Sequence, residues 1–425
     1  MLYALYELNQ LALTPLATAA RAHAALLRSP FNPASHTELS RIVAAAEEVF
    51  ESVTRRYRKP EWGIESTRIA GVDVPVTIET VWASPWCGLV HFQRDKSVLP
   101  REGRRPDPPV LIVAPMSGHY ATLLRGTVET FLPDHDVYIT DWVDARRVPL
   151  FVGRFDLHDF IDHVRAMIAH IGPGASIVGV CQPGPGVLAA IAMMEEDDDP
   201  ALPATMTFMG SPIDARKSPT APNKLAEDKP FEWFEQQMIH TVPPVYPAAF
   251  RRVYPGFVQL ASFMGMNLNR HVEAHREYFN NLVKGDGETA QKHRDFYEEY
   301  LSVMDLTEEF YLQTIRDVFK EYKLARGVFD HRGRRVRPER IKRVALMTVE
   351  GERDDISGVG QTQAAHEICA AIPASMRFDY VQPGVGHYGV FNGRRFATEI
   401  YPRVREFIRT IRTQPRPRLR AVEAA

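Results

Sequence analysis

Residues 176–186, Ser-Ile-Val-Gly-Val-Cys-Gln-Pro-Gly-Pro-Gly, place a cysteine where a nucleophile could act. The first five residues have the apolar, β-branched composition of a buried strand, and the Ala-rich run that follows is typical of a helix. Cys181 therefore comes at a strand-to-helix turn. The unpaired backbone N–H groups at the start of a helix favour a thiolate over a thiol, so we interpret Cys181 as a covalent nucleophile.

The pattern resembles the nucleophile elbow Gly-x-Ser-x-Gly, with Cys181 in the place of serine. Residues next to such a nucleophile must be small enough to clear the sheet, and Gly179 and Gly184 meet that demand. Pro183 departs from the elbow, where glycine is usual, but the first turn of a helix tolerates proline. The alternative interpretation of Cys181 is a buried, inert cysteine, which is the usual meaning of a lone cysteine.

A cysteine nucleophile needs a base, and His387 is the best placed of the 15 histidines. It lies in a glycine-rich loop after the last predicted strand, from which an imidazole can reach over the sheet edge. The carboxylate that orients the base is expected one strand earlier, after residues 344–349. Asp354 is the first choice, Asp355 is a near-equivalent competitor, and Asp214 is a third candidate. The chain order Cys, Asp, His is that of the α/β-hydrolases.

An acyl-transfer site must also stabilise an oxyanion, commonly with two backbone N–H groups. The residue after the nucleophile, Gln182, is expected to supply the first. The second is expected from the loop that follows the strand at 110–114, through the amide of Met116 or Ser117. No elbow pattern surrounds Ser117, which makes it a weak candidate for a separate nucleophile.

Two further clusters have a functional and a plain interpretation. His271 and His275 share one helical face, but the glutamate between them is displaced from the His-Glu-x-x-His arrangement and no third metal ligand is evident. The basic run at 332–343 could bind phosphates, although such a run is more often a solvated basic turn before a strand. We expect no metal at the first and no catalytic role for the second.

Short apolar runs that alternate with helical patterns must position the chemical groups. They lie at 110–114, 137–140, 176–180, 205–208, 344–349 and 376–381. Fully apolar runs of this length are typical of buried parallel strands. The sequence therefore predicts an α/β fold with a mostly parallel, doubly wound sheet and an inserted helical cap. The elbow pattern and the order Cys, Asp, His match the α/β-hydrolase fold within that class.

The same pattern divides the chain into five segments. Residues 1–60 read as an N-terminal helical preface, 61–211 as the first part of the core, 212–343 as the helical cap, 344–412 as the second part of the core, and 413–425 as a flexible C-terminal tail. The cap is placed over the carboxyl edge of the sheet.

Aromatic side chains are dense in the predicted cap. We expect most of them to pack in its core and a minority to line an access path to Cys181. A helical stretch is expected from Glu298 to Tyr322. The aromatics are Phe231, Trp233, Phe234, Tyr246, Phe250, Tyr254, Phe257 and Phe263.

Composition excludes several other classes of protein. The chain has 425 residues, 45% of them hydrophobic, and 51 Lys and Arg against 53 Asp and Glu, so no global positive field attracts nucleic acid. Three widely spaced cysteines encode neither a disulfide scaffold nor a zinc knuckle. No Lys or Arg precedes Arg21, so a secretory signal lacks its basic start, and no apolar run approaches the roughly 20 residues that span a bilayer. We expect a cytoplasmic protein.

Six motifs together resemble the intracellular poly(3-hydroxybutyrate) depolymerases, cysteine-dependent esterases of the α/β-hydrolase fold that are related to the polyhydroxyalkanoate synthases. The resemblance covers nearly the whole chain. It rests on residues 111–119 (LIVAPMSGH), 139–145 (ITDWVDA), 178–183 (VGVCQP), 209–214 (MGSPID), 348–356 (TVEGERDDI) and 384–387 (GVGH).

The resemblance implies cleavage of polyester at storage granules, with the family's nucleophile, acid and base at Cys181, Asp354 and His387. It implies no cofactor, although coenzyme A could replace water as the acyl acceptor, and the granule surface is the expected partner. A polyester synthase or another acyltransferase is the alternative within enzymes. A granule-surface binding protein, attached through its aromatic cap and apolar N-terminus, is the alternative outside them.

Overall fold

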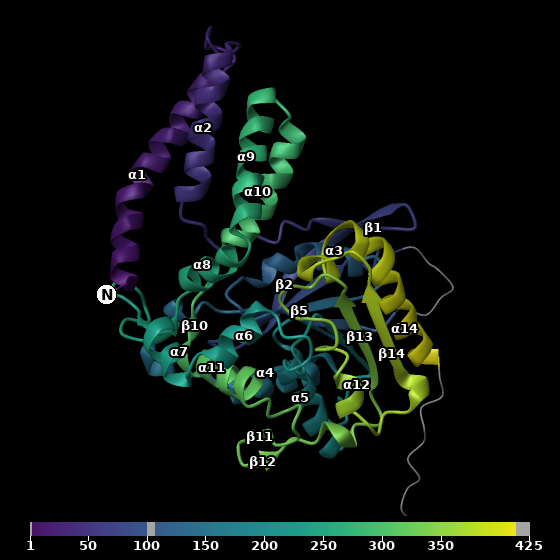
Figure 1. Ribbon diagram of the computed structural model, residues 1–425. Helices are drawn as coiled ribbons and strands as arrows, with labels where there is room; N and C mark the ends of the chain where they lie inside the picture. The colour runs from purple at the N-terminus through teal and green to yellow at the C-terminus, as the bar shows by residue number, and fades with distance from the viewer. Residues whose placement is uncertain (1, 100–106, 414–425) are drawn as a thin grey trace, which may run out of the picture.

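The computed structural model describes residues 2–99 and 107–413. Figure 1 shows a body built around one large sheet, from which two helical hairpins project side by side. One hairpin is formed by α1 (Leu2–Arg28) and α2 (Glu38–Thr54), and the other by α9 (Leu268–Lys284) and α10 (Gly287–Leu301). Of the tail expected to be flexible, residues 414–425 lie outside the described residues.

The main sheet of the described chain has nine strands in the order β1-β2-β3-β5-β4-β6-β7-β13-β14. The first three strands and the β3–β5 pair are antiparallel, and every later pair is parallel. The predicted mostly parallel sheet is thus confirmed, and its antiparallel strands lie at one edge. The strands are β1 (Ser66–Ile69), β2 (Val72–Ala83), β3 (Cys87–Arg94), β4 (Val110–Val113), β5 (Val137–Trp142), β6 (Ser176–Val180), β7 (Thr205–Met209), β13 (Ala345–Gly351) and β14 (Arg377–Gln382).

The register of the parallel strands aligns their carboxyl ends. Met209 pairs with Val180 on one side and with Val349 on the other, and Gly351 pairs with Gln382. The loops that follow β6, β7, β13 and β14 therefore leave the sheet at one edge. All four strands between β4 and β13 are fully buried, as expected for parallel strands covered on both faces.

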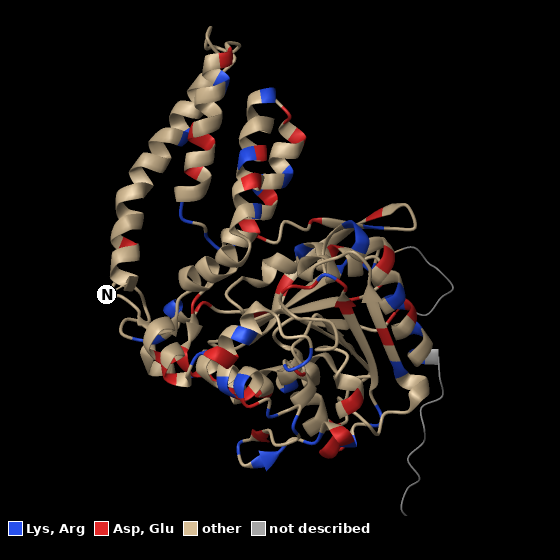
Figure 2. Ribbon diagram, in the orientation of Figure 1, with Lys and Arg blue, Asp and Glu red and all other residues tan. Residues whose placement is uncertain are grey.

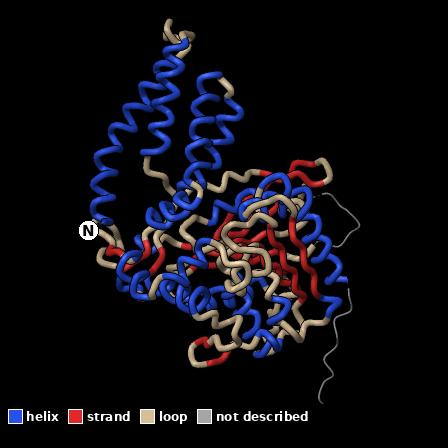
Figure 3. The backbone as a smooth tube through the Cα atoms, viewed as in Figure 1, coloured by secondary structure: helices blue, strands red, loops and turns tan. Residues whose placement is uncertain are grey.

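Helices cover both faces of the sheet (Figure 3), which matches the predicted doubly wound class. The helix directly after Cys181, α5, is buried from Gly184 to Glu195, because its residues are apolar around almost the whole circumference. The core helices are α3 (Arg125–Phe131), α4 (Leu157–Ile171), α5 (Gly184–Glu196), α12 (Ala365–Ile368), α13 (Gly393–Arg395) and α14 (Tyr401–Thr413).

The segment between β7 and β13 forms the cap. It carries a small antiparallel sheet in the order β10-β9-β8 and a separate hairpin of β11 and β12. Its elements are α6 (Ala221–Asp228), α7 (Phe231–Met238), β8 (His240–Thr241), β9 (Arg252–Tyr254), α8 (Gly256–Met266), α9, α10, β10 (Leu306–Thr307), α11 (Glu308–Thr314), β11 (Asp330–His331) and β12 (Arg334–Arg335).

The prediction of one continuous helix from Glu298 to Tyr322 is wrong. The helix α10 ends at Leu301, and residues 302–307 cross back to the body, where β10 pairs with β9. A second helix, α11, then begins with Thr307 as its cap, whose side chain accepts from the Phe310 amide. Apolar periodicity continued across this break because both helices bury one face.

The projecting hairpins are held together by a small apolar cluster of their own. Ala45 from α2 packs against Tyr278 and Leu282 from α9 and Ala290 from α10. The N-terminal end of α1 is fixed to the cap instead, through a hydrogen bond of 2.6 Å from the Tyr3 hydroxyl to Asp305. Among the described helices, none is both long and apolar enough to cross a membrane.

Asp305 lies buried where α1 meets the cap. Its Oδ1 accepts from the Gly256 amide at 2.9 Å, and its Oδ2 accepts from Tyr3. Burial, assisted by the charge of Asp144, raises the pKa of Asp305 to about 7, while Arg146 and the two hydrogen bonds act in the opposite direction. The folded chain therefore holds a proton at a pH at which an exposed aspartate has released it.

This proton makes the free energy of unfolding fall as the pH rises from about 4 to about 7, because the folded state binds it and the unfolded state does not. We expect Asp305→Asn to flatten that dependence, by up to about 1.4 kcal/mol per pH unit. Urea unfolding of both proteins across this pH range measures the slopes. Identical slopes would show that another group titrates.

Candidate active site

Cys181 occupies the turn between β6 and α5 in a left-handed backbone conformation, with φ of 64°. Such a conformation costs a residue with a side chain about 1–2 kcal/mol, and strain of this kind is typical of a nucleophile elbow. The backbone holds it in place: the Cys181 amide donates to the Met209 carbonyl at 2.8 Å, and the Gly184 amide donates to the Cys181 carbonyl at 3.2 Å.

The glycines around Cys181 are required by close packing. A Cβ at Gly184 would lie 2.5 Å from the Ser211 Cβ, and one at Gly186 would lie 2.7 Å from the Phe160 ring. Pro183 is the N-cap of α5 with φ of −62°, the value that its ring imposes. The departure from the usual elbow is therefore accommodated without strain at the proline.

The structure places Asp354 and His387 together beside this turn. His387 Nδ1 lies 2.8 Å from Asp354 Oδ2, and both side chains are almost fully buried. The other carboxylate oxygen of Asp354 accepts from the amides of Ile356 and Ser357 at 2.9 and 2.8 Å. These amides fix the carboxylate, so that it orients the imidazole with Nε2 free for the thiol.

Electrostatics favour a protonated His387. Burial alone would lower its pKa, but the negative charges and hydrogen bonds of Cys181 and Asp354 outweigh that effect and raise the pKa well above its usual value. The imidazolium is thus stabilised by the same two groups that a catalytic triad requires.

The competing carboxylates are placed elsewhere. Asp355 accepts a hydrogen bond of 2.9 Å from the Asn267 side chain in the cap. Asp214 makes a two-point ion pair with Arg216, at 2.7 and 2.8 Å, which together with the Arg216 amide and Lys217 holds its pKa below the usual value despite partial burial. The structure therefore brings Asp354, rather than either competitor, to His387.

The expected oxyanion donors lie close together, with one feature that the sequence did not predict. The Met116 amide donates to the Gln182 side-chain oxygen at 3.1 Å. The Gln182 side chain therefore already binds the Met116 amide, which is one of the two amides expected as the second oxyanion donor. Ser117 lies beside it and lines the same cavity as Cys181.

A cavity of about 430 Å³ opens directly over Cys181, between the sheet edge and the cap. Its walls are mainly apolar. Of the eight cap aromatics named from the sequence, Phe234, Tyr254 and Phe263 line it, whereas Phe250 is 67% exposed elsewhere. The expectation that a minority would line a path to Cys181 agrees with this placement.

Gly210 is a site residue that the analysis of the sequence did not assign. It directly follows β7 with φ of 55°, and a Cβ there would lie 3.1 Å from His387 Cε1 and 3.3 Å from Asp354 Oδ2. The signal was present, because a glycine at the end of a strand beside the elbow often marks a close approach.

We therefore expect Gly210→Ala to displace the His387–Asp354 pair and to lower turnover about tenfold or more, since small misplacements of catalytic groups are costly. Gly63→Ala is the matched control, because Gly63 also has positive φ, of 61°, with nothing within 4 Å of its Cβ position. Both variants should lose similar stability in thermal unfolding. Equal activity in the two would contradict the role given to Gly210.

The other two cysteines are buried, and the histidine pair is held by hydrogen bonds. Cys87 and Cys369 are fully buried, and burial raises the pKa of Cys87 well above its usual value and that of Cys369 to about 12. His271 Nδ1 lies 2.9 Å from the Tyr297 hydroxyl, and His275 Nδ1 lies 2.9 Å from the His271 carbonyl. Across residues 2–99 and 107–413, no group of three His, Cys, Asp or Glu side chains is arranged to hold a metal ion.

The strand order, the strained turn at Cys181 and the His387–Asp354 pair at the carboxyl edge are the features of an α/β-hydrolase fold. Residues 210–412 match the family model described as PHB de-polymerase C-terminus. The matched residues make up just under half of the chain, and the match confirms the resemblance to this family seen in its motifs. The matched part contains Asp354 and His387, and Cys181 precedes it.

Solved structures with similar folds include a putative lipase from Acinetobacter baumannii AYE, with 12% identity, a TM-score of 0.41, and coverage of 79% of this chain and 92% of that one. Another is 2-hydroxy-6-oxo-6-phenylhexa-2,4-dienoate hydrolase from Rhodococcus sp. strain RHA1, with 11% identity, a TM-score of 0.42, and coverage of 79% and 99%. A comparison with curated proteins gave no match.

Proposed function

We propose that this protein is an intracellular depolymerase that cleaves the ester bonds of poly(3-hydroxybutyrate) through Cys181, Asp354 and His387. The observation that carries the proposal is the buried His387–Asp354 pair beside a cysteine in a strained turn, under an apolar cavity. The family match over residues 210–412 supports the polyester substrate.

The chemistry follows from the geometry. His387 Nε2 takes the proton of the Cys181 thiol, while Nδ1–H donates to Asp354. The thiolate attacks the ester carbonyl, and the backbone amides of Gln182 and of Met116 or Ser117 stabilise the oxyanion. As the C–O bond breaks, the imidazolium returns its proton to the leaving alkoxide and a thioester remains on Cys181.

A second half-reaction releases the acyl group. His387 accepts a proton from water, or from the thiol of coenzyme A, as that nucleophile attacks the thioester carbonyl. The Cys181–acyl bond then breaks and returns the thiolate. Water gives a free acid, and coenzyme A gives its thioester, so the two acceptors leave different products.

If Met116 is the second oxyanion donor, the Gln182 side chain must release it first. Its oxygen accepts from the Met116 amide in this structure, and it must move before that amide can bind an oxyanion. If Ser117 is the donor, Gln182 stays in place and keeps the loop ordered. Gln182→Ala distinguishes these cases, because it raises turnover in the first and lowers it in the second.

Substrate class is supported by the cavity. A polyester chain is uncharged and partly apolar, and the cavity over Cys181 is lined by apolar side chains from both the core and the cap. We place the protein at granule surfaces in the cytoplasm, where an exposed apolar mouth can take up a polymer segment.

Release of 3-hydroxybutyrate from amorphous granules, with and without coenzyme A, tests the proposal. A depolymerase releases the free acid in water alone, or the coenzyme A thioester when that acceptor is needed. Chain extension from hydroxyacyl thioesters would instead identify a synthase. Granule binding without any release would identify a surface protein.

The cavity mouth gives a separate prediction. Leu225 and Met266 line the cavity and are 42% and 37% exposed, so they are placed to contact an entering polymer. We expect Leu225→Ser with Met266→Ser to lower polymer turnover about tenfold, as loss of two apolar contacts would, and to leave nitrophenyl butyrate hydrolysis within about twofold of the parent.

The matched control is Val245→Ser, since Val245 is a cap residue that is 79% exposed and lies outside the cavity lining. It should change neither reaction. Equal losses on polymer and soluble ester in the double variant would mean that the mouth supports the fold only.

A further inference from the structure

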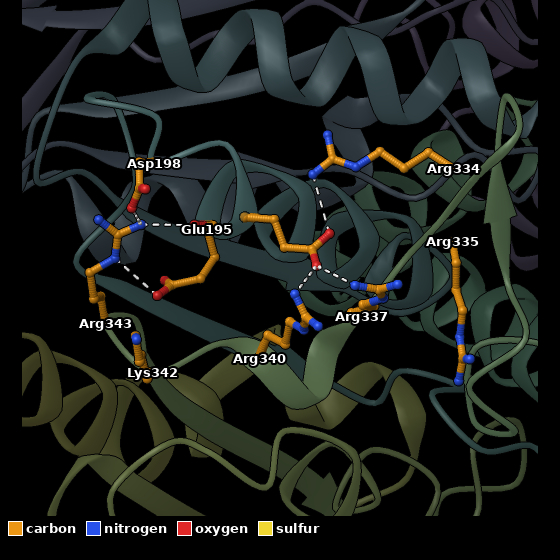
Figure 4. A pocket seen from close by; sticks show the side chains of 9 residues that line it. Glu195, Asp198, Arg334, Arg335, Arg337, Arg340, Lys342 and Arg343 are labelled. Atoms are coloured by element: carbon orange, nitrogen blue, oxygen red, sulfur yellow. Dashed lines mark hydrogen bonds and ion pairs between the residues drawn. The ribbon is translucent and has the colours of Figure 1, made fainter.

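A second pocket, of about 550 Å³, lies at the end of the sheet opposite the candidate active site. Figure 4 shows it between the C-terminal end of α5 and residues 334–343, the segment that leads into β13. Cys181 precedes the other end of α5, and Asp354 follows the other end of β13. The seven residues of β13, roughly 20 Å of strand, therefore separate this pocket from the thiol.

The pocket is strongly cationic. Six basic side chains line it against three carboxylates, a formal charge of +3 in a chain whose net charge is −2. Figure 2 shows the basic residues gathered around β12. The basic side chains are Arg334, Arg335, Arg337, Arg340, Lys342 and Arg343.

The carboxylates do not neutralise this charge. Three of the arginines, Arg334, Arg337 and Arg340, share the carboxylate of Glu196, at 3.2, 3.6 and 3.4 Å. Figure 4 shows the guanidinium groups of these three arginines close to one another. Within the described part of the chain, neither Arg335 nor Lys342 has an ion pair within 4 Å. Arg334 also pairs with Asp197, and Arg343 pairs with Glu195 and Asp198. Arg337 and Arg340 share Glu196, so some of their hydrogen-bond donors stay available to a ligand.

The basic segment is held rigidly. Val336, Pro338 and Ile341 alternate with the basic side chains and are buried, Val336 at 1% and Ile341 at 0% exposure. The Val336 amide donates to the Phe329 carbonyl, and the Ile341 amide donates to the Pro338 carbonyl. A solvated turn would lack such anchors, so the guanidinium groups are arranged before any ligand arrives.

We propose that this pocket binds an anion that carries two or more phosphate groups. Planar guanidinium groups suit phosphate oxygens, each of which accepts two or more hydrogen bonds. Four cations, Arg335, Arg337, Arg340 and Lys342, exceed what a single carboxylate or phosphate needs, and the volume admits a chain of several phosphates. The distance from Cys181 separates this site from the acyl acceptor, so binding is independent of the ester cleavage proposed above.

The test uses the full-length protein with inorganic tripolyphosphate as the probe, measured by isothermal titration calorimetry. We expect saturable binding that weakens as salt is added. Arg340→Gln with Lys342→Gln should weaken it about tenfold or more, the effect of losing charge-assisted hydrogen bonds. Glu196→Gln should strengthen it, because a competing carboxylate is removed.

A charge-matched control is Arg252→Gln with Lys292→Gln, which also removes two exposed positive charges but lies outside the pocket. It should leave tripolyphosphate binding unchanged, and both double variants should keep hydrolysis of nitrophenyl butyrate. No saturable binding by the parent protein, or equal weakening in the two double variants, would overturn the proposal.

Vesicles distinguish a free anion from a lipid headgroup. Sedimentation with vesicles that contain cardiolipin, whose headgroup carries two phosphates, against phosphatidylcholine alone, measures the second source. Binding to tripolyphosphate without sedimentation identifies a soluble polyphosphate ligand. Sedimentation that Arg340→Gln with Lys342→Gln abolishes identifies phosphate headgroups as the source, and neither result would overturn the site.

Discussion

Cys181→Ala should abolish ester cleavage and leave the fold intact. Loss of the nucleophile of a serine triad lowers turnover by about 10⁶-fold, and we expect a loss of at least about 10⁴-fold here. The left-handed backbone at Cys181 is held by hydrogen bonds that do not involve its side chain, so thermal unfolding should change little. Turnover of nitrophenyl butyrate and of granules measures the effect.

Cys369→Ala is the control, because Cys369 is fully buried in the hydrophobic core. It should keep near-parental turnover while losing some stability through the small cavity that it creates. Cys181→Ser should retain a trace of activity, since the geometry persists with a weaker nucleophile. Parental turnover in Cys181→Ala would remove this residue from the mechanism.

His387→Gln should be nearly as damaging as loss of the nucleophile, since a base is harder to replace than its orienting partner. Asp354→Asn should lower acylation by up to about 10⁴-fold, the loss known for the acid of a serine triad. It removes the acceptor that holds His387 Nδ1 at 2.8 Å. Single-turnover kinetics with a chromogenic ester measures the acylation step for each variant.

The pH dependence separates a catalytic role of Asp354 from a structural one. Its charge is one cause of the raised pKa of His387, so Asp354→Asn should lower that pKa, and the imidazolium should lose its proton at a lower pH. An NMR titration of His387 reports the shift. Asp355→Asn is the control, because Asp355 bonds Asn267. A larger effect from Asp355→Asn would reassign the acid.

Most of the candidate active site could be predicted from the sequence, because its residues lie in recognisable local patterns. A cysteine among small residues at a strand-to-helix turn implies an elbow, and residues just after parallel strands must meet at one edge. Cys181, Asp354 and His387 follow β6, β13 and β14, and the register aligns those ends. The order Cys, Asp, His along the chain then predicts which residue is the nucleophile, which the acid and which the base.

Features that depend on contacts between distant parts of the chain could not be predicted from the sequence. The bond between the Met116 amide and the Gln182 side chain joins residues 66 positions apart, and no local pattern encodes it. Gly210 differs, because its place at the end of a strand is a local signal, but its close approach to His387 depends on the folded sheet edge. The break after Leu301 was hidden because apolar periodicity runs through α10 and α11 alike.

The cationic pocket, too, could not be predicted from the sequence, because it depends on long-range contacts. The basic run at 332–343 reads as a solvated turn when it is taken alone. Its carboxylate partners lie about 140 positions earlier, at the end of α5, so only the folded chain reveals that three arginines share Glu196.

Trapping of the acyl-enzyme tests the central claim most directly. The parent protein is mixed with a nitrophenyl ester of 3-hydroxybutyrate, quenched in acid at short times, and mapped by peptide mass spectrometry. The account predicts a hydroxybutyryl group on the peptide that contains Cys181, formed before free acid appears and absent from Cys181→Ala. An acyl group on Ser117 or any other residue, or product formation with no adduct at any quench time, would contradict it.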